Sequence, residues 1–273
     1  MTSLASLHNV TVTGDGETTL LLSHGFGCGQ SAFRFLVKDL ARDYRVVTYD
    51  LAGAGGYPVG QFDRRRYQTL NGYARDVIAI CDELGLRDVV HVGHSVSAMI
   101  AGLAAIERPG LFARLVMIGP SPRYINEGDY FGGFTATDIE ELVEVMGENY
   151  TGWSNQMAPA IMGNAERPEL GRELTTSFCA QNPEIAKFFA RVTFTSDNRA
   201  DLPNITTPTL VLQCQDDIIA PEIVGRYVHD HLPHSTFVLM DARGHLPNVS
   251  APAETIRLIR RFLADVSEPA ARV

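Results

Sequence analysis

The sequence predicts an α/β fold, with a mostly parallel central sheet, helices on both faces and a helical insertion. The first observation is that short apolar, β-branched runs alternate with helical patterns through the first half of the chain. The second is that this alternation stops at Pro120 and resumes only at Thr209. Because parallel strands need a crossover between them, usually a helix, the strand–helix repetition predicts a parallel sheet covered on both sides.

Seven segments have the short, apolar and β-branched character of buried strands. They are His8–Thr13, Thr19–Ser23, Arg45–Asp50, Asp88–Gly93, Leu115–Ile118, Thr209–Cys214 and Ser235–Met240. Apolar residues at helical spacing predict the connecting helices. These are Ala32–Ala41, Tyr67–Leu84, Ala98–Ile106, Pro221–His231 and Ala253–Leu263.

The middle of the chain carries short helix signatures and no convincing strand. Thr137 with Glu140 has the spacing of a capping box. Asn182 followed by Pro183 has the pattern of an N-cap and a first helical residue. Weaker helical candidates are Trp153–Met162 and Glu169–Ala180.

The size and composition favour one folded domain. A chain of 273 residues with 45% hydrophobic and 20% charged residues has a globular composition, not a disordered one. The simplest organisation is an α/β core of residues 1–120 and 201–273, into which residues 121–200 are inserted as a helical lid. The final residues, SEPAARV, are expected to form a frayed tail. The net charge of −9 argues against nucleic acid and anionic membranes as partners.

Targeting and metal signals are missing from the sequence. The N-terminal MTSLASLHNV lacks the basic and apolar regions of a signal peptide. The four cysteines, Cys28, Cys81, Cys179 and Cys214, are scattered without a C-x-x-C pair, so zinc spacing is absent. We therefore expect a cytoplasmic protein with reduced thiols and with no metal or other cofactor.

One uncharged stretch raises the question of a membrane span. Val89–Ile106 has 18 residues without a formal charge, which is just long enough for a transmembrane helix. Its pattern predicts instead a strand, followed by the motif Gly93-His94-Ser95-Val96-Ser97 and then a helix. A serine on such a strand-to-helix turn is typical of a nucleophile elbow, which lifts the hydroxyl out of the sheet. The alternative is a Gly-Ser turn that merely starts a helix.

A nucleophilic serine needs a base, and the base needs an orienting acid. Asp216 and Asp217 follow one predicted strand and His245 follows the last, so both groups belong at the carboxyl edge of the sheet. We predict Ser95 as nucleophile, His245 as base and Asp217, rather than Asp216, as the acid. His94 is adjacent to the serine and is therefore excluded as its base.

An oxyanion hole needs backbone donors beside the serine. Val96, the residue after the nucleophile, is expected to supply one N–H. The loop His24-Gly25-Phe26-Gly27 follows an early strand, and its glycines allow close approach to the substrate. Phe26 N–H is therefore the second predicted donor; the alternative is a glycine-rich turn selected only for tightness.

These motifs together resemble the α/β-hydrolase superfamily. They are HGFG at 24–27, GHSVS at 93–97, a Q-x-x-x-D-x-x-x-P run at Gln213, Asp217 and Pro221, and GH at 244–245. The run GHSVSAMI is similar to the branch containing the bacterial stress regulator RsbQ and the plant strigolactone and karrikin receptors. The resemblance spans nearly the whole chain and implies an α/β-hydrolase fold with a four-helix lid over an apolar pocket.

The resemblance also implies which residues line that pocket. By position they are Phe26, His94, Phe134, Leu142, Trp153, Met157 and Phe194. The chain departs from the branch at Met157, where Phe or Tyr is frequent, and at Phe33, where Trp is frequent.

Two function classes follow. The first is a serine hydrolase that cleaves a small, largely apolar ester or lactone. The alternative is an RsbQ-like sensor that binds or slowly hydrolyses a small hydrophobic ligand and regulates a protein partner. The resemblance to RsbQ implies a PAS-containing phosphatase as that partner. Carbon–carbon bond hydrolysis and perhydrolysis use the same triad and stay open, whereas haloalkane dehalogenation would need a carboxylate in place of Ser95.

Overall fold

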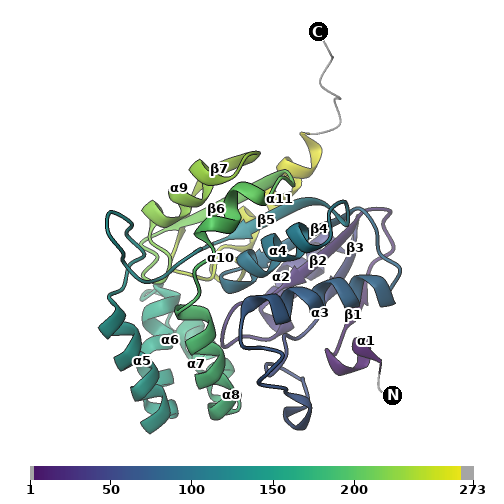
Figure 1. Ribbon diagram of the computed structural model, residues 1–273. Helices are drawn as coiled ribbons and strands as arrows, with labels where there is room; N and C mark the ends of the chain where they lie inside the picture. Colours follow the sequence, from purple (N-terminus) through teal and green to yellow (C-terminus); the bar gives the residue numbers. More distant parts are fainter. Residues whose placement is uncertain (1–2, 266–273) are drawn as a thin grey trace.

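The computed structural model describes residues 3–265 and forms one seven-stranded sheet of order β1-β3-β2-β4-β5-β6-β7 (Figure 1). Neighbouring strands are parallel except for the antiparallel pair β1 and β3, which confirms the predicted, mostly parallel sheet. The tail expected at residues 267–273 lies outside the described residues. The strands are β1 (Thr11–Thr13), β2 (Thr19–Ser23), β3 (Arg45–Thr48), β4 (Val89–His94), β5 (Phe112–Ile118), β6 (Thr209–Gln215) and β7 (Ser235–Arg243).

Helices cover both faces of the sheet because alternate strand residues point to opposite sides. Along β2, Leu21 packs with the cluster that includes α3, α4 and α9, whereas Leu20 and Leu22 pack with α2 and α11. These helices are α2 (Arg34–Leu40), α3 (Leu70–Glu83), α4 (Val96–Glu107), α9 (Glu222–His231) and α11 (Pro252–Ala264). Short helices are α1 (Leu4–Leu7), α10 (Pro247–Ser250) and the 3₁₀ turns Gln30–Phe33, Val59–Gln61 and Arg199–Asn204.

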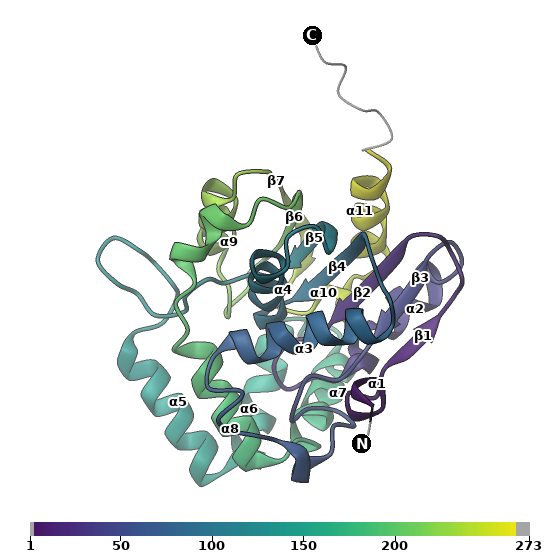
Figure 2. The same cartoon turned by 45° about the vertical axis from the view of Figure 1, so that its right-hand side comes forward.

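Four further helices lie between β5 and β6 and are called here the four-helix insertion. They group together below the sheet in both views (Figures 1 and 2). They have their own apolar cluster, which also includes residues of the strand-end loops such as Cys28 and Leu246. The helices are α5 (Ala136–Glu148), α6 (Tyr150–Met162), α7 (Pro168–Cys179) and α8 (Pro183–Phe194).

The helix caps of the insertion match the sequence prediction in one case of two. Asn182 caps α8, with Pro183 as its first residue, as predicted. The predicted capping box of Thr137 and Glu140 is wrong. The box is formed by Thr135 and Asp138. Thr135 still has an extended backbone (φ −80°, ψ 164°) and precedes the helix, whereas Thr137 already lies in the first turn of α5.

Several predicted strand boundaries also differ from the structure: β3 ends at Thr48 rather than Asp50, β7 continues to Arg243 rather than ending at Met240, and β1 and β5 begin at other residues than predicted. The chain from His8 does not enter a strand at once: His8 ends α1, and β1 begins only at Thr11. The buried His8 ring instead donates from Nδ1 to the carbonyl oxygen of Asp50, at 2.9 Å. Strand β5 begins at Phe112, before the predicted Leu115.

The uncharged stretch of residues 89–106 is divided between β4 and α4, with Ser95 between them. Helix α4 begins at Val96, two residues before the prediction, because the helical turn follows the serine directly. Every α4 residue from Val96 to Ala105 is buried, which accounts for the absence of charge. Within residues 3–265, no helix is long and apolar enough to span a bilayer.

Candidate active site

Ser95 occupies a strained turn between β4 and α4. Its backbone has φ 58° and ψ −127°, a combination that non-glycine residues rarely adopt. The turn is held by its N–H, which donates to the carbonyl oxygen of Ile118 at 2.8 Å. A Cβ atom at Gly93 would collide with the Ser97 carbonyl oxygen, so the turn needs glycine there. The Ser95 hydroxyl is thereby presented at the carboxyl edge of the sheet, at the N-terminus of α4.

A continuous chain of hydrogen bonds joins Ser95, His245 and Asp217. His245 Nε2 lies 2.7 Å from Ser95 Oγ, and His245 Nδ1 lies 2.7 Å from Asp217 Oδ2. Because a carboxylate only accepts, Nδ1 carries the imidazole proton and Nε2 accepts from the serine hydroxyl. All three side chains are buried. The arrangement is that of a nucleophile, a base and the group that orients the base.

The side chains of the two adjacent aspartates have different surroundings in the structure. Asp217 Oδ1 accepts from the backbone N–H groups of Ile219 and Ala220, at 2.9 and 3.0 Å, which fixes the carboxylate toward His245. Asp216 has a left-handed backbone (φ 52°) and a solvent-exposed side chain, 3.6 Å from Arg243. Only Asp217 therefore contacts the histidine.

Two backbone N–H groups flank the serine. A Cβ atom at Gly25 would lie 2.8 Å from His94 Nδ1 and 3.0 Å from Ser95 Cβ, so this loop passes directly against the nucleophile. Phe26 follows Gly25 in the loop. Val96 is the first residue of α4, so its N–H has no partner within the helix. Both predicted donors therefore stay candidates for an oxyanion hole.

Ser97 has a role that the sequence did not indicate. Its hydroxyl donates to the carbonyl oxygen of His24 at 2.6 Å, which ties the elbow to the loop carrying Phe26. His24 is fixed in turn: Nδ1 donates to the Gly25 carbonyl oxygen at 2.9 Å, and Nε2 accepts from Leu51 N–H at 3.0 Å. Burial lowers the pKa of His24. The signal in the sequence was the serine at a position that is usually glycine.

His94 supports the catalytic loop. Its Nε2 donates to the carbonyl oxygen of His245 at 2.7 Å, and the two rings lie 5.0 Å apart. Burial, with a smaller contribution from His245, lowers the pKa of His94 to about 3, so the ring stays neutral. His94 therefore holds the backbone of His245.

The end of α6 also holds the loop that carries His245. The His245 N–H donates to the Ile161 carbonyl oxygen at 3.0 Å. Gly163 and Gly244 both have positive φ, 66° and 74°, and a Cβ on Gly163 would lie 2.9 Å from Gly244 Cα. A Cβ on Gly244 would collide with the Met162 carbonyl oxygen. This contact could not be predicted from the sequence, and it makes part of the insertion a support for the site.

A small cavity of about 30 Å³ opens beside Ser95. Three of the predicted pocket residues, Phe26, His94 and Phe194, line it. Tyr124 and Phe178, which the sequence did not assign to the pocket, line it as well. The remaining lining residues are Cys28, Ser95, Ile161, Leu174, Thr193, Ile219, His245 and Leu246.

The other four predicted pocket residues do not line this cavity. Trp153 stacks on Phe178, with ring centroids 5.4 Å apart and planes 7° apart, and so lies behind it. Phe134, Leu142 and Met157 are half-buried against the same apolar cluster. Helical spacing identified an apolar face, but the rotation of each helix decides which aromatic ring reaches Ser95.

Cys28 lies in the cavity wall but is not a reactive thiolate. Burial raises its pKa to about 12, so the thiol stays protonated at neutral pH. All four cysteines are free, and Cys179 is the exposed one. Within residues 3–265, no three His, Cys, Asp or Glu side chains are grouped so as to hold a metal ion.

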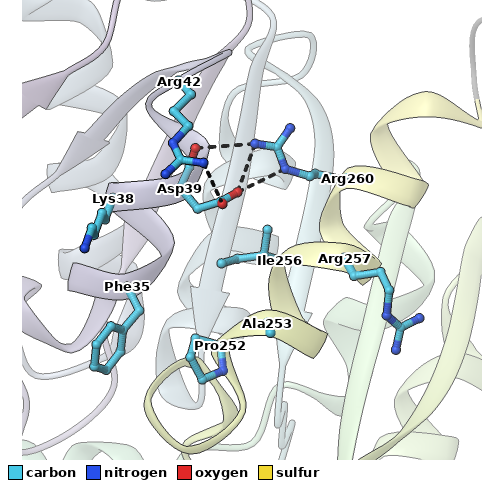
Figure 3. A pocket seen from close by; sticks show the side chains of 9 residues that line it. All are labelled: Phe35, Lys38, Asp39, Arg42, Pro252, Ala253, Ile256, Arg257 and Arg260. Carbon is cyan, nitrogen blue, oxygen red and sulfur yellow. Dashed lines mark hydrogen bonds and ion pairs between the residues drawn. The ribbon is translucent and has the colours of Figure 1, made fainter.

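A wider surface groove of about 620 Å³ lies away from this cavity, between α2 and α11 (Figure 3). At one end of the groove Arg260 contacts Asp39 at 3.0 Å, and it also contacts Asp43 at 2.7 Å. These contacts join α2 to α11 across the sheet face. The groove has no histidine, serine or cysteine in its lining, so the candidate chemistry is confined to the cavity at Ser95.

Comparison with known proteins agrees with this geometry. Residues 20–258 match the model of the alpha/beta hydrolase family. The chain is 42% identical to the strigolactone esterase D14 of Arabidopsis thaliana over 93% of this chain and 96% of that protein. It is 41% identical to the karrikin insensitive 2 receptor CA of Petunia hybrida, covering 94% of this chain and 95% of the other.

A solved structure agrees as well. A hydrolase from Oleispira antarctica superposes with a TM-score of 0.92 at 40% identity, covering 95% of this chain and 96% of that one. The chain therefore belongs to the α/β-hydrolase family, in the branch that contains the strigolactone esterases and karrikin receptors.

Proposed function

We propose that this α/β hydrolase cleaves small, largely apolar esters or lactones through Ser95, His245 and Asp217. The observation that carries the proposal is the hydrogen-bond chain from Asp217 through His245 to Ser95, with 2.7 Å at each link. Support comes also from the esterase names of relatives at about 40% identity. The mostly apolar wall of the cavity favours an apolar substrate.

In the first half of the reaction, Ser95 Oγ attacks the substrate carbonyl while His245 Nε2 takes the hydroxyl proton. The carbonyl oxygen becomes an oxyanion, which accepts hydrogen bonds from the N–H groups of Phe26 and Val96. Asp217 keeps the imidazole oriented and stabilises its positive charge. The carbon–oxygen bond to the alcohol then breaks, and His245 returns the proton to the leaving alcohol.

In the second half, water replaces the alcohol. His245 takes a proton from the water, whose oxygen attacks the acyl carbon. The bond from the acyl carbon to Ser95 Oγ breaks, and Oγ recovers its proton from His245. The products are the acid and the free enzyme, and no redox partner is needed. In a lactone the alcohol stays attached to the acyl group throughout, so the product is a single hydroxy acid.

The test is turnover of p-nitrophenyl acetate and butyrate by the Ser95→Ala variant. Loss of a serine nucleophile costs about 10⁶-fold in kcat in other triads, so we expect turnover to fall by a comparable factor. The exposed Ser6→Ala is a control that keeps wild-type turnover. Wild-type turnover by Ser95→Ala would refute the proposal.

A second candidate function is a ligand sensor, because a relative at 41% identity is named a karrikin insensitive receptor. In this alternative the four-helix insertion acts as a lid that changes position when the cavity is filled. Capture of a protein partner that depends on both ligand and an intact Ser95 would support it. Rapid turnover of a physiological ester, without such capture, would exclude it. The PAS-containing phosphatase and the cytoplasmic location stay predictions of the sequence.

A further inference from the structure

A second hollow adjoins the cavity at Ser95. It is an open groove of about 470 Å³ between α7 on one side and the segments after Phe26 and His245 on the other. Cys28, Leu174 and Leu246 line both the groove and the cavity, so they form the wall between the two. The cavity and the groove therefore meet at these three residues.

The cavity by itself is too small for a whole ester substrate. At about 30 Å³ it has room for about two water molecules. A short acyl group is the largest substrate part that fits there without a change in the wall. The rest of a longer substrate needs another place, and the groove is continuous with the cavity once the wall moves.

Of the three wall residues, Leu174 is the one that lies on the four-helix insertion. Its side chain is only 3% exposed and belongs to α7, whereas Cys28 and Leu246 belong to the oxyanion and histidine loops. Helix α7 is attached to the core by a hydrogen bond from Ser177 Oγ to the Gly27 carbonyl oxygen, at 2.8 Å. Displacing Leu174 leaves the catalytic loops in place.

An ion pair across the groove adds little resistance to such a movement. Arg34 of α2 contacts Glu173 of α7 at 2.6 Å, with side chains 37% and 46% exposed. Exposed pairs of this kind stabilise a fold weakly, because water screens both charges. The pair leaves Glu173 neutralised, so the groove offers no free charge from this residue.

The groove borders the loop that carries His245. Leu246 follows His245, the residue that returns a proton to the alcohol in the proposed reaction. The groove wall near the cavity is apolar, with Ala32, Met162 and Val249. Its outer part carries the hydroxyl and amide groups of Ser31, Thr176 and Gln181. This gradient matches an alcohol that is apolar near the ester and polar, without charge, at its far end.

We propose that the groove is a leaving-group subsite, and that Leu174 is the gate between it and the cavity. The preferred substrates are then esters of a short acid with an elongated alcohol. The inference rests on the proposed hydrolase function and specifies which part of the substrate is long.

The experiment compares kcat/KM for hexyl acetate and methyl acetate. Methyl hexanoate is the third substrate, in which the long chain belongs to the acid instead of the alcohol. Ala180 is exposed and lines the groove, so Ala180→Trp should fill it without disturbing the core. We expect the hexyl-to-methyl acetate ratio to fall at least tenfold in Ala180→Trp. Leu174→Ala removes the gate and should raise the ratio several-fold.

Leu170→Ala is the matched control for Leu174→Ala. It removes the same atoms one turn earlier on α7, where the side chain packs against the insertion's apolar cluster and lines neither hollow. Its ratio should equal that of the wild type. Thermal unfolding by circular dichroism shows whether both variants fold. If Leu174→Ala does not fold, Ala180→Trp still tests the subsite, because Ala180 is exposed.

An unchanged acetate ratio in Ala180→Trp would overturn the subsite. A drop confined to methyl hexanoate would overturn its assignment to the alcohol, because the groove would then hold the acyl chain. Failure of the hydrolase proposal gives a different result: methyl acetate turnover would then survive in Ser95→Ala. If turnover depends on Ser95 but the acetate ratio is the same in Ala180→Trp as in the wild type, the subsite is rejected and the hydrolase proposal stands.

Discussion

The strand-end loops and the four-helix insertion contribute to the site in different ways. The loops after β4, β6 and β7 supply Ser95, Asp217 and His245, and each side chain is fixed by hydrogen bonds of its own backbone or carboxylate. The insertion supplies mainly apolar wall residues such as Phe178 and Phe194. In the proposed reaction the loops supply the reacting groups, and the insertion supplies the wall that a substrate would contact.

The insertion is itself divided. The end of α6 is bonded through its backbone to His245, and two glycines allow the chains to approach closely. Helix α7 is joined to the core by the Ser177 hydroxyl and the exposed Arg34–Glu173 pair. Part of the insertion therefore supports the backbone of His245, whereas α7 contacts the core through side chains, among them Phe178 against Gly27.

The largest effect beyond the nucleophile is expected at the Asp217–His245 contact. Asp217→Asn should lower kcat by about 10⁴-fold, because an amide stabilises the wrong tautomer of the imidazole. Asp216→Asn, on the adjacent exposed side chain, is the matched control and should keep kcat within twofold, roughly, as surface changes do. Steady-state kinetics on p-nitrophenyl acetate measure both. Equal losses in the two variants would remove the distinction between the aspartates.

A smaller loss is expected where α6 supports His245. Gly163→Ala introduces a Cβ close to Gly244 Cα, so the loop must shift. Misplacing a catalytic group by about 1 Å can cost about 10²-fold, and we expect a fall in kcat of this order. Gly128→Ala also has positive φ (57°), but its Cβ would meet open space, so it controls for backbone strain. A Gly163→Ala enzyme with unchanged kcat would limit the insertion to substrate binding.

The acid sensitivity that arises from histidine should be a property of the core alone, because residues 121–200 contain no histidine. Burial lowers the pKa of His91 to about 3, and burial with His245 does the same for His94. Both rings are neutral in the folded chain but take up protons in the unfolded chain below about pH 6.5. Stability is therefore unaffected by them above that pH and falls as the pH is lowered toward 3.

We expect each histidine to reduce the free energy of unfolding by roughly 2 kcal/mol at pH 5 relative to pH 7.5. Urea unfolding at the two pH values measures the loss. The loss should be smaller in His91→Gln and unchanged in His231→Gln, whose histidine is exposed. An identical pH dependence in all three proteins would contradict the assignment.

Much of the framework could be predicted from the sequence, because it depends on local rules. The strand pattern and the order of Ser95, Asp217 and His245 follow from periodicity and from residues that directly follow strands. The pocket wall could not be predicted in the same way. Trp153 and Phe178 are both apolar helical residues, and only the packing of α6 against α7 puts Phe178 in front.

Long-range backbone contacts could not be predicted from the sequence either. The approach of Gly163 to Gly244 joins segments far apart in the chain, and the GH motif at 244–245 does not indicate which residue Gly244 contacts. The Ser97 hydroxyl bond to His24 is similar: the departure from glycine was visible, but its partner was not. Such contacts depend on the assembled fold rather than on neighbouring residues.

The central claim is that the strand-end loops make Ser95 a nucleophile. The most direct measurement is mass spectrometry of the protein after reaction with a fluorophosphonate, which forms a covalent bond with activated serines. We predict a single adduct on the peptide containing Ser95, with much slower labelling in His245→Ala and none at that peptide in Ser95→Ala. An adduct on another residue, or labelling of Ser95 at the wild-type rate in His245→Ala, would contradict the account.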